Sequence, residues 1–326
     1  MNDPIDRALL NDWQRDFPIT ERPFGALAEA LGTNEADVIT RLRAKAAAGQ
    51  ITRLGATCAP NTISASTLAA VAAPENRIEE VAQIIGEEPG INHSYLREND
   101  WNLWFVATGP DRAHVDSALA RIGQRSGLRV LDLRLVRPFN LDLGFSLRGD
   151  DQRAPLSAPP DTAVLQPGDR EIVQALMRGL PLELRPFAAL AEGLGREASE
   201  VMARIRVLSA ARIIARFGII VRHRALGWRA NAMVVWDLPH EAITRAGSAL
   251  AMQPGVTLCY ERSPVEVVWP YRLYSMIHAR SRKEARARLE AATALPDLQG
   301  VPYQVLFSSH CFKQTGALVA HERTVA

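Results

Sequence analysis

Lysine, cysteine and long apolar runs are all scarce in this chain of 326 residues. Only Lys45, Lys283 and Lys313 accompany 35 arginines. GC-rich coding is the simplest explanation of that bias, but guanidinium groups also suit planar carboxylates and phosphates. The three cysteines show no CxxC spacing and no Cys/His cluster, which predicts reduced thiols and neither a disulfide framework nor a metal site.

Membrane and secretion signals are lacking too. No run approaches the roughly 18 apolar residues that a spanning helix needs. The amino terminus does not show the basic-then-apolar pattern of a secretion signal. We therefore expect a cytoplasmic protein without a membrane partner.

The chain contains one sequence unit twice. Matched residues are 163 positions apart through the first part of the unit, 165 further on, and 170 after an insertion before the second copy's third strand. The matched pairs include Asp6 and Asp169, Leu31 and Leu194, Gly55 and Gly218, Tyr95 and Tyr260, and Arg97 and Arg262. This period is too long for a solenoid and indicates a tandem duplication, which predicts an internal pseudo-twofold dimer.

Each copy is predicted to contain two modules. The first has three short helices joined by tight turns, typical of a winged helix-turn-helix. These helices are expected at 6–17, 23–31 and 33–48, and again at 169–178, 186–193 and 197–210. The second module has the βαββαβ order of a ferredoxin-like domain. Its strands are expected at 67–73, 91–97, 101–108 and 128–136, and again at 229–236, 255–262, 271–278 and 302–309. The predicted fold class is α+β.

Domain boundaries follow from this organisation. Residues 146–168 are rich in proline and polar residues without an apolar period, which predicts a linker. The expected domains are 1–55 (helix-turn-helix) and 56–145 (ferredoxin-like) in the first copy, and 169–218 and 219–326 in the second.

Candidate site residues follow one another along the strand expected at 91–97. Because strand side chains alternate, His93, Tyr95 and Arg97 share one face. The second copy has Tyr260 and Arg262 at the matching positions, with a leucine in place of the histidine. An imidazole, a phenol and a guanidinium in one row can donate protons and hold an acid, although an ordinary exposed polar face would show the same pattern.

A basic segment marks a difference between the copies. It runs from Arg216 through Arg222 and His223 to Arg224, where the first copy retains only Arg53. A duplicated scaffold with one asymmetric site would diverge in this way, although a solvated basic loop is the simpler explanation.

Aromatic residues provide a third candidate feature. Tyr274 and His278 share one face of their strand, and Trp104 aligns with Tyr274. Large aromatic side chains can bracket a flat ligand, although an aromatic stripe more often belongs to the core.

A helix-turn-helix followed by βαββαβ resembles the Lrp/AsnC transcriptional regulators, in which the first module reads DNA and the second binds effectors and dimerises. The charge pattern argues against DNA as a partner here. The candidate recognition helix sets Arg41, Arg43 and Lys45 against two acids, and residues 1–150 hold 16 basic and 20 acidic residues. Phosphate neutralisation favours a clearer basic excess, so a helix-turn-helix retained as scaffold explains the charge at least as well.

Longer strings resemble the siroheme decarboxylases, in a fused two-subunit form from the pathway to the haem of dissimilatory nitrite reductase. The strings are Asn92-His93-x-Tyr95-x-Arg97-Glu98 with Trp101-Asn102-Leu103-Trp104, Val221-Arg222-His223-Arg224-x-Leu226-Gly227, Leu258-Cys259-Tyr260-x-Arg262 with Trp269-Pro270-Tyr271, and Phe312-Lys313-Gln314-x-Gly316. This resemblance covers essentially the whole chain. Leu96 and the Gly316-Ala317-Leu318 ending depart from the family pattern.

The resemblance implies removal of the C12 and C18 acetate carboxylates of siroheme, which gives 12,18-didecarboxysiroheme and two CO2. It implies His93 and His223 as catalytic acids, because a histidine can deliver the proton that the new methyl group requires. The implied substrate-binding residues are Arg53, Tyr95, Arg97, Trp104, Arg216, Arg222, Tyr260, Arg262, Tyr274 and His278. No separate cofactor or protein-bound metal is expected, since the iron arrives within the substrate.

Several alternatives stay open at this point. The chain could be a tetrapyrrole-responsive DNA-binding regulator or a non-catalytic haem carrier. A histidine could ligate the substrate iron, and the copies could form one site or two, although the asymmetric histidines favour one dominant site. Siroheme and related iron tetrapyrroles are the expected partners, with neighbouring enzymes of the pathway and a further homo-oligomer as candidates.

Overall fold

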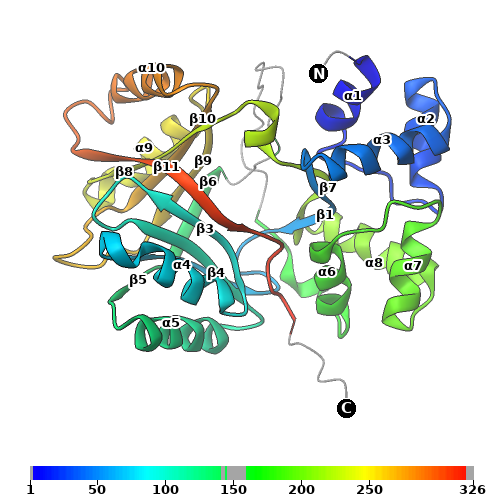
Figure 1. The fold of residues 1–326 in the computed structure, drawn as a ribbon, viewed down its shortest axis with the longest axis horizontal. Helices are drawn as coiled ribbons and strands as arrows, with labels where there is room; N and C mark the ends of the chain where they lie inside the picture. Colours follow the sequence, from blue (N-terminus) through cyan, green and yellow to red (C-terminus); the bar gives the residue numbers. More distant parts are fainter. Residues whose placement is uncertain (1–2, 141–143, 145–158, 321–326) are drawn as a thin grey trace.

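The computed structural model describes residues 3–140, 144 and 159–320 and places the two copies in one helical unit and one sheet unit (Figure 1). The helical unit contains α1 (Pro4–Asp12), α2 (Pro23–Leu31), α3 (Glu35–Ala47), α6 (Asp169–Arg178), α7 (Pro186–Leu194) and α8 (Ala198–Ala210). Each copy therefore contains the three predicted helices, but α1 ends at Asp12 and not at residue 17 as predicted. The predicted linker lies outside the described residues up to 158, and its remainder contains a 3-10 turn at Thr162–Val164.

Local chemistry determines where the helices begin and end. The Asp3 side chain accepts from the first backbone N–H groups of α1, and the Asn34 side chain accepts from Asp37 N at the start of α3. Helices α2 and α7 both begin with proline, and each ends at a glycine in the left-handed conformation, Gly32 or Gly195. Both copies therefore carry the same sequence signals for the start and the end of the middle helix.

One strand from each copy joins the two helix-turn-helix modules. Strand β1 (Ile51–Cys58) pairs antiparallel with β7 (Ile214–Val221), and Gly55 lies directly opposite Gly218. These glycines match at the offset of 163, so the pseudo-twofold axis passes between them. The wing expected in each copy is therefore a two-stranded ribbon shared by both.

Backbone of the helical unit packs directly against the two axis glycines of this ribbon. A Cβ atom on Gly55 would lie 2.2 Å from Leu176 O, and one on Gly218 would lie 2.5 Å from Trp13 O. Each glycine therefore admits backbone from the other copy, Leu176 at the end of α6 and Trp13 just after α1. The apolar core of this unit draws buried side chains from both copies.

The sheet unit is a closed barrel. Its strands are β2 (Ala65–Val71), β3 (Ile91–Arg97), β4 (Leu103–Gly109), β5 (Val130–Leu133), β6 (Leu135–Asn140), β8 (Ala230–Trp236), β9 (Val256–Arg262), β10 (Leu273–Ala279) and β11 (Tyr303–Gln314). The spatial order is β5-β2-β4-β3-β11-β8-β10-β9-β6. Only Arg134 separates β5 from β6, so the two ends of this order are one continuous segment and the sheet closes.

The last strand of each copy connects the two ferredoxin-like modules. Strand β11 pairs first with β8 of its own copy and then with β3 of the other. In the same way β5 pairs with β2 and β6 continues onto β9. The sequence pattern predicts ends near 136 and 309, but the strands run on to Asn140 and Gln314, because their additional residues pair with the other copy.

Helices cover the outside of the barrel (Figure 1). Helices α4 (Ile78–Glu87) and α5 (Arg112–Ser126) pack against the strands of the first copy, and α9 (Ile243–Ala251) and α10 (Arg282–Thr293) against those of the second. A separate apolar cluster that includes Trp104, Tyr274 and Leu306 fills the interior between the two halves. The predicted α+β duplication is confirmed.

The two axis glycines provide a test of the ribbon. Replacing Gly55 or Gly218 with alanine inserts a methyl group where backbone of the other copy lies, so each variant should lose about 1–3 kcal/mol of unfolding free energy. Denaturant titration measures that loss. Gly193→Ala is the matched control, because nothing lies within 4 Å of its new Cβ atom in α7 and alanine favours a helix by about 0.5–1 kcal/mol. Equal stability of all three variants would contradict the described interlock.

Candidate functional site

Polar side chains gather at the end of the barrel that faces the ribbon. Tyr95 lies opposite Trp104 in the β3–β4 register, and His93 lies opposite Val106, so both face the barrel interior. His278 lies opposite Asn231 in the β10–β8 register and two residues along from the interior Met276. The ribbon lies between this end of the barrel and the helices (Figure 1).

The first centre combines His93 of β3 with Arg53 of β1. Burial and the nearby charge of Arg53 lower the pKa of His93 to about 4. Arg53 donates from Nη2 to Ala56 O at 3.2 Å, and its buried Nε has no hydrogen-bond partner among the described residues. Burial also lowers the pKa of Arg53. At neutral pH this centre therefore contains a neutral imidazole beside a buried guanidinium with a free donor.

Tyr95 stands next to His93. Its ring is stacked with the imidazole, with 6.3 Å between centroids and 24° between planes. Tyr95 is also opposite Cys311 in the β3–β11 register. Burial raises the pKa values of the Tyr95 phenol and the Cys311 thiol, so both carry their protons at neutral pH.

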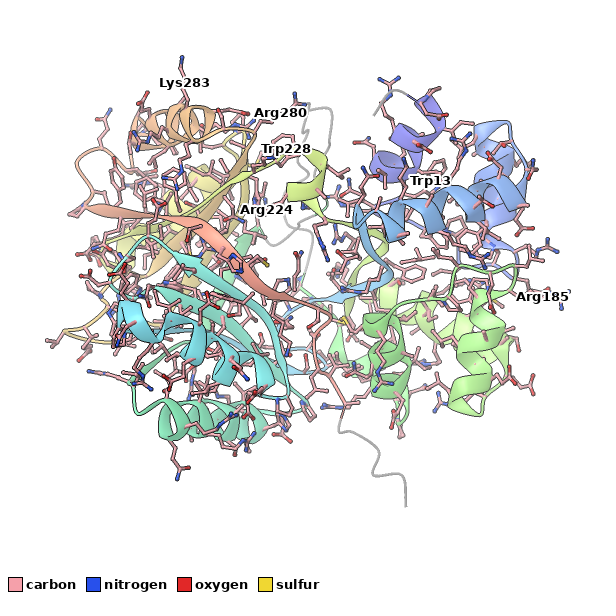
Figure 2. All side chains as sticks on the ribbon, in the orientation of Figure 1. Trp13, Arg185, Arg224, Trp228, Arg280 and Lys283 are labelled. Atoms are coloured by element: carbon pink, nitrogen blue, oxygen red, sulfur yellow. The ribbon has the colours of Figure 1, made fainter. Side chains whose placement is uncertain are left out.

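The second centre combines His223 with Arg216 and His278. His223 begins the 3-10 helix η3 (His223–Leu226), which lies between the barrel and the helical unit near Arg224 and Trp228 (Figure 2). Its ring centroid is 6.1 Å from that of His278. Burial, His278 and the charge of Arg216 together lower the pKa of His223 to about 3. His223 is therefore neutral in the free protein.

Hydrogen bonds fix His278 in one tautomer. Its Nδ1 is 2.6 Å from Thr257 Oγ1, and that hydroxyl donates its only hydrogen to Met276 O at 3.2 Å. Nδ1 must then carry the proton, while Nε2 accepts from Asn231 Nδ2 at 2.9 Å. An imidazole held on both sides in this way suits a positioning role beside His223.

Arg97 and Arg262 are equivalent in the two copies and make equivalent contacts. Arg97 Nη1 donates to Leu306 O at 3.1 Å, and Arg262 Nη1 donates to Leu133 O at 2.6 Å. Each guanidinium also lies over a tyrosine ring of its own strand. Both arginines thus hold the point where a last strand leaves its own sheet. The Nε atoms have no partner among the described residues, and the carboxylate role of these arginines stays a prediction.

Three predicted ring-flanking residues belong to the barrel core. Trp104 and Tyr274 are 1% and 0% exposed, and Tyr260 stacks on Tyr274 with 5.8 Å between centroids. Trp269 donates from Nε1 to the Tyr274 hydroxyl at 2.8 Å. Trp104 lies opposite Tyr95 in the β3–β4 register, but among the described residues none of these three rings stacks on a histidine, and their contact with a ligand stays a prediction.

Arg222 lies at the end of the ribbon. Its backbone N–H donates to Gln50 O at 2.8 Å, just before β1 begins, and its side chain is exposed. The charges of Arg222 and Arg224 both act on the Cys311 thiol, which places this basic segment over the face that carries Tyr95. Arg222 therefore follows β7 at the end of the ribbon where β1 begins.

Sequence reasoning missed Cys311, Thr257 and Asn231. The β-strand alternation would have placed Asn231 on the face of Met233, but it cannot identify a partner on another strand. Cys311 lies in the part of β11 that extends onto the other copy, so no local pattern pairs it with Tyr95.

A cavity of about 480 Å³ lies elsewhere, lined mostly by the first copy, and none of the predicted site residues lines it. Its lining includes Ser64, Ser66, Arg112, Arg134 and Arg170. Arg112 and Arg134 are already paired with aspartates. This cavity is therefore separate from both histidine centres.

Within residues 3–140, 144 and 159–320, no group of three or more His, Cys, Asp or Glu side chains could hold a metal ion. The helices described for this chain include none with the length and hydropathy to cross a membrane.

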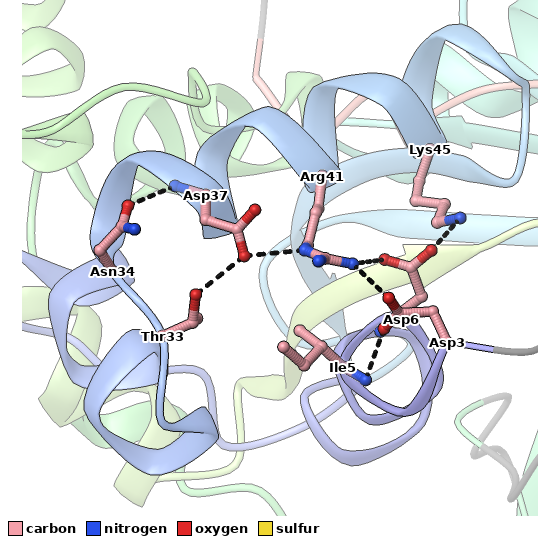
Figure 3. A network of polar contacts seen from close by, with 8 residues as sticks. All are labelled: Asp3, Ile5, Asp6, Thr33, Asn34, Asp37, Arg41 and Lys45. Atoms are coloured by element: carbon pink, nitrogen blue, oxygen red, sulfur yellow. Dashed lines mark hydrogen bonds and ion pairs between the residues drawn. The ribbon is translucent and has the colours of Figure 1, made fainter.

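Two of the three basic residues of the candidate recognition helix, Arg41 and Lys45, form ion pairs within the protein, whereas Arg43 is exposed (Figure 3). Arg41 of α3 binds Asp3, Asp6 and Asp37, and Lys45 binds Asp6. In the second copy Arg204 of α8 binds Asp169 in the same way. These ion pairs connect the first and third helices of each module and neutralise charges that a DNA reader would direct to phosphates.

Comparisons with known proteins agree with this architecture. The AsnC-like ligand binding domain matches residues 63–139 and 225–313, and the Siroheme decarboxylase NirDL-like HTH domain matches residues 6–51 and 169–214. The chain is 56% identical to the Siroheme decarboxylase NirDL subunit of Paracoccus pantotrophus over 319 residues, which cover 98% of each protein. The subunit of the same name from Paracoccus denitrificans is 54% identical over 318 residues, again 98% of each.

Solved structures extend the comparison. The crystal structure of the siroheme decarboxylase NirDL superposes with a TM-score of 0.68 and 26% identity, covering 97% of this chain and 94% of that one. The same enzyme in complex with an iron-uroporphyrin III analogue gives a TM-score of 0.67 and 25% identity, with the same coverage. Sequence, domain composition and fold thus agree over nearly the full length. The chain belongs to the siroheme decarboxylase NirDL family, in which both copies of the unit are fused.

Proposed function

We propose that this chain removes the C12 and C18 acetate carboxylates of siroheme to give 12,18-didecarboxysiroheme. The observation that carries the proposal is the pair of buried arginine–histidine centres at the barrel end, Arg53 with His93 and Arg216 with His223. A family relative has been crystallised with an iron-uroporphyrin III analogue, which supports a tetrapyrrole as ligand. The reaction makes the chain a carboxy-lyase.

The chemistry needs a carboxylate anchor and a proton. An arginine holds each acetate carboxylate, which fixes the scissile bond. When the bond to the carboxyl carbon breaks, CO2 leaves and the electron pair passes into the macrocycle. A histidine then delivers one proton to the methylene carbon, which becomes a methyl group. Each step therefore consumes one proton and needs no added oxidant or reductant, so we propose no separate cofactor.

The low histidine pKa values fit this cycle. In the free protein His93 and His223 are neutral because burial and neighbouring positive groups disfavour imidazolium. A bound carboxylate neutralises the arginine and adds a negative charge beside the ring, and both effects raise the histidine pKa. We infer that each histidine takes up its proton as substrate binds and transfers that same proton to carbon.

Removing either histidine should slow turnover of siroheme. His93→Ala and His223→Ala should each slow complete conversion to the product that has lost two carboxylates by about 100-fold or more, the usual contribution of a positioned acid. Anaerobic incubation with siroheme followed by mass spectrometry measures this conversion. His240→Ala is the control, because its side chain is 72% exposed and lies away from both centres. Wild-type rates of double decarboxylation in either centre variant would remove that histidine from the mechanism.

Binding of a carboxylate-bearing tetrapyrrole should make the protein take up protons. Calorimetric titration with an iron-uroporphyrin III analogue, in two buffers of different ionisation enthalpy, should show net uptake of protons near pH 7. His93→Gln should reduce that uptake, because glutamine retains hydrogen bonding without titrating. Binding with no buffer dependence would show that the histidines stay neutral in the complex.

A DNA-binding regulator is the competing function, and the ion pairs of Arg41 and Lys45 argue against it. A gel-shift titration should show no sequence-dependent complex in the preparation that turns over siroheme. Tight, salt-sensitive, sequence-dependent binding without turnover would contradict the proposed function. A haem carrier would bind the ring and leave its mass unchanged.

A further inference from the structure

Residues 315–320 form a strap that crosses from the barrel to the helical unit and passes beside α6 (Figure 1). The strap begins next to the first histidine centre. The last residue of β11 lies opposite His93 in the β11–β3 register, and Thr315 N donates to Asn92 O at 2.7 Å. The strap ends in the apolar core of the helical unit, where Val319 is fully buried. It therefore connects the start of β3 to the helices.

One buried side chain of α6 binds three backbone groups of the strap. Oε1 of Gln174 accepts from Val319 N at 2.8 Å and from Ala320 N at 3.2 Å. Its Nε2 donates to Ala317 O at 3.3 Å. A glutamine amide has two acceptor lone pairs and two donor hydrogens, so it can satisfy all three groups at once. Removing it would take this acceptor from two buried N–H groups, which costs free energy.

Two further contacts hold the strap in place. A Cβ atom on Gly316 would lie 2.2 Å from Met177 O, so the strap lies directly against the last turn of α6. On the barrel side, Leu318 N donates to Thr108 Oγ1 of β4 at 2.9 Å, and β4 pairs with β3. The strap is therefore fixed between α6 and the two strands that begin and end at the first histidine centre.

The same end of α6 contacts the ribbon at Arg53. A Cβ atom on Gly179, the residue that follows α6, would lie 3.1 Å from Arg53 Cβ. Leu180 N donates to Leu54 O at 2.7 Å. One end of this helix thus contacts both the ribbon at Arg53 and the strap that leads away from His93.

We propose that Gln174 is a positioning residue for His93. By binding the strap, it keeps the start of β3 against α6 and the ribbon, so that the imidazole and the Arg53 guanidinium keep the separation that proton delivery requires. A displacement of about 1 Å in a reacting group can lower turnover by about 100-fold. The second helix-turn-helix module thus contributes to the reaction through geometry. This inference rests on the proposed function, in which His93 delivers a proton.

The pKa of His93 in the free protein reports on this geometry. Burial and the charge of Arg53 lower that pKa from 6.5 to about 4. Gln174→Met keeps the length of the side chain but removes its hydrogen bonds, and Gly316→Ala places a methyl group against Met177 O. In both variants a displaced strap should admit water to His93 and let it move away from Arg53, so its pKa should rise towards 6.5.

NMR titration of histidine-labelled protein without substrate measures this pKa, and the spectrum of His93→Gln identifies the signal. The neighbouring groups do not interfere with the titration. Burial raises the pKa values of Tyr95 and Cys311, so both keep their protons over this range. The guanidinium of Arg224, whose charge acts on both groups, stays protonated throughout.

Turnover of siroheme is the second measurement. Gln174→Met and Gly316→Ala should each lower kcat for decarboxylation by at least about 10-fold, because the acid is misplaced. Leu27→Ala is the stability control. It removes a fully buried side chain of α2 from the same apolar core, so it should lower the thermal unfolding temperature and leave the pKa of His93 at about 4.

Three outcomes would count against parts of this interpretation. An unchanged His93 pKa in folded Gln174→Met and Gly316→Ala would overturn the positioning role of Gln174. An equal rise in Leu27→Ala would overturn it too, because general loosening of the helical unit would then explain the effect. A raised pKa with wild-type turnover would support the control of His93 by the strap and contradict instead the proton-donor role of His93 in the proposed function.

Discussion

The pairing of Gly55 with Gly218 is the contact on which the rest of the structure depends. It fixes the axis between the copies, and its two missing side chains admit backbone from the opposite helical module. The same pairing determines where Arg53 and Arg216 stand on the ribbon. The barrel also joins the two copies, because β11 and the β5–β6 segment each pair first with a strand of their own copy and then with a strand of the other. Neither copy can thus form its part of the site alone.

Buried arginines beside neutral histidines are the main chemical feature of the barrel end. Arg53 and Arg216 are both poorly exposed, and the adjacent histidines are neutral. Burying a guanidinium group away from water costs free energy unless a negatively charged group binds to it. In the proposed function a carboxylate-rich tetrapyrrole is such a partner, and we propose that its binding converts the neutral histidines into acids. Substrate binding and acid activation are then the same electrostatic event.

The sequence alone predicts the duplication, the order of the modules and one strand face of the site. Repeat offsets identify the duplication, and the alternation in β3 correctly places His93 and Tyr95 on one face. Alternation cannot say what covers that face, so the same argument that selected His93 also selected Trp104 and Tyr274, which lie in the core. The pairing of β1 with β7 and of β11 with β3 joins residues more than 150 positions apart, and no local pattern encodes it. For that reason the partner of Cys311 appears only in three dimensions.

The proposed function requires the substrate to lie between the ribbon and the barrel end. A crystal structure of this chain with an iron-uroporphyrin III analogue tests it most directly. We expect the macrocycle at this position, with one carboxylate arm on Arg53 near His93 and another on Arg216 near His223. A macrocycle bound instead at the cavity lined by Arg112, Arg134 and Arg170, with neither histidine near a carboxylate arm, would contradict it.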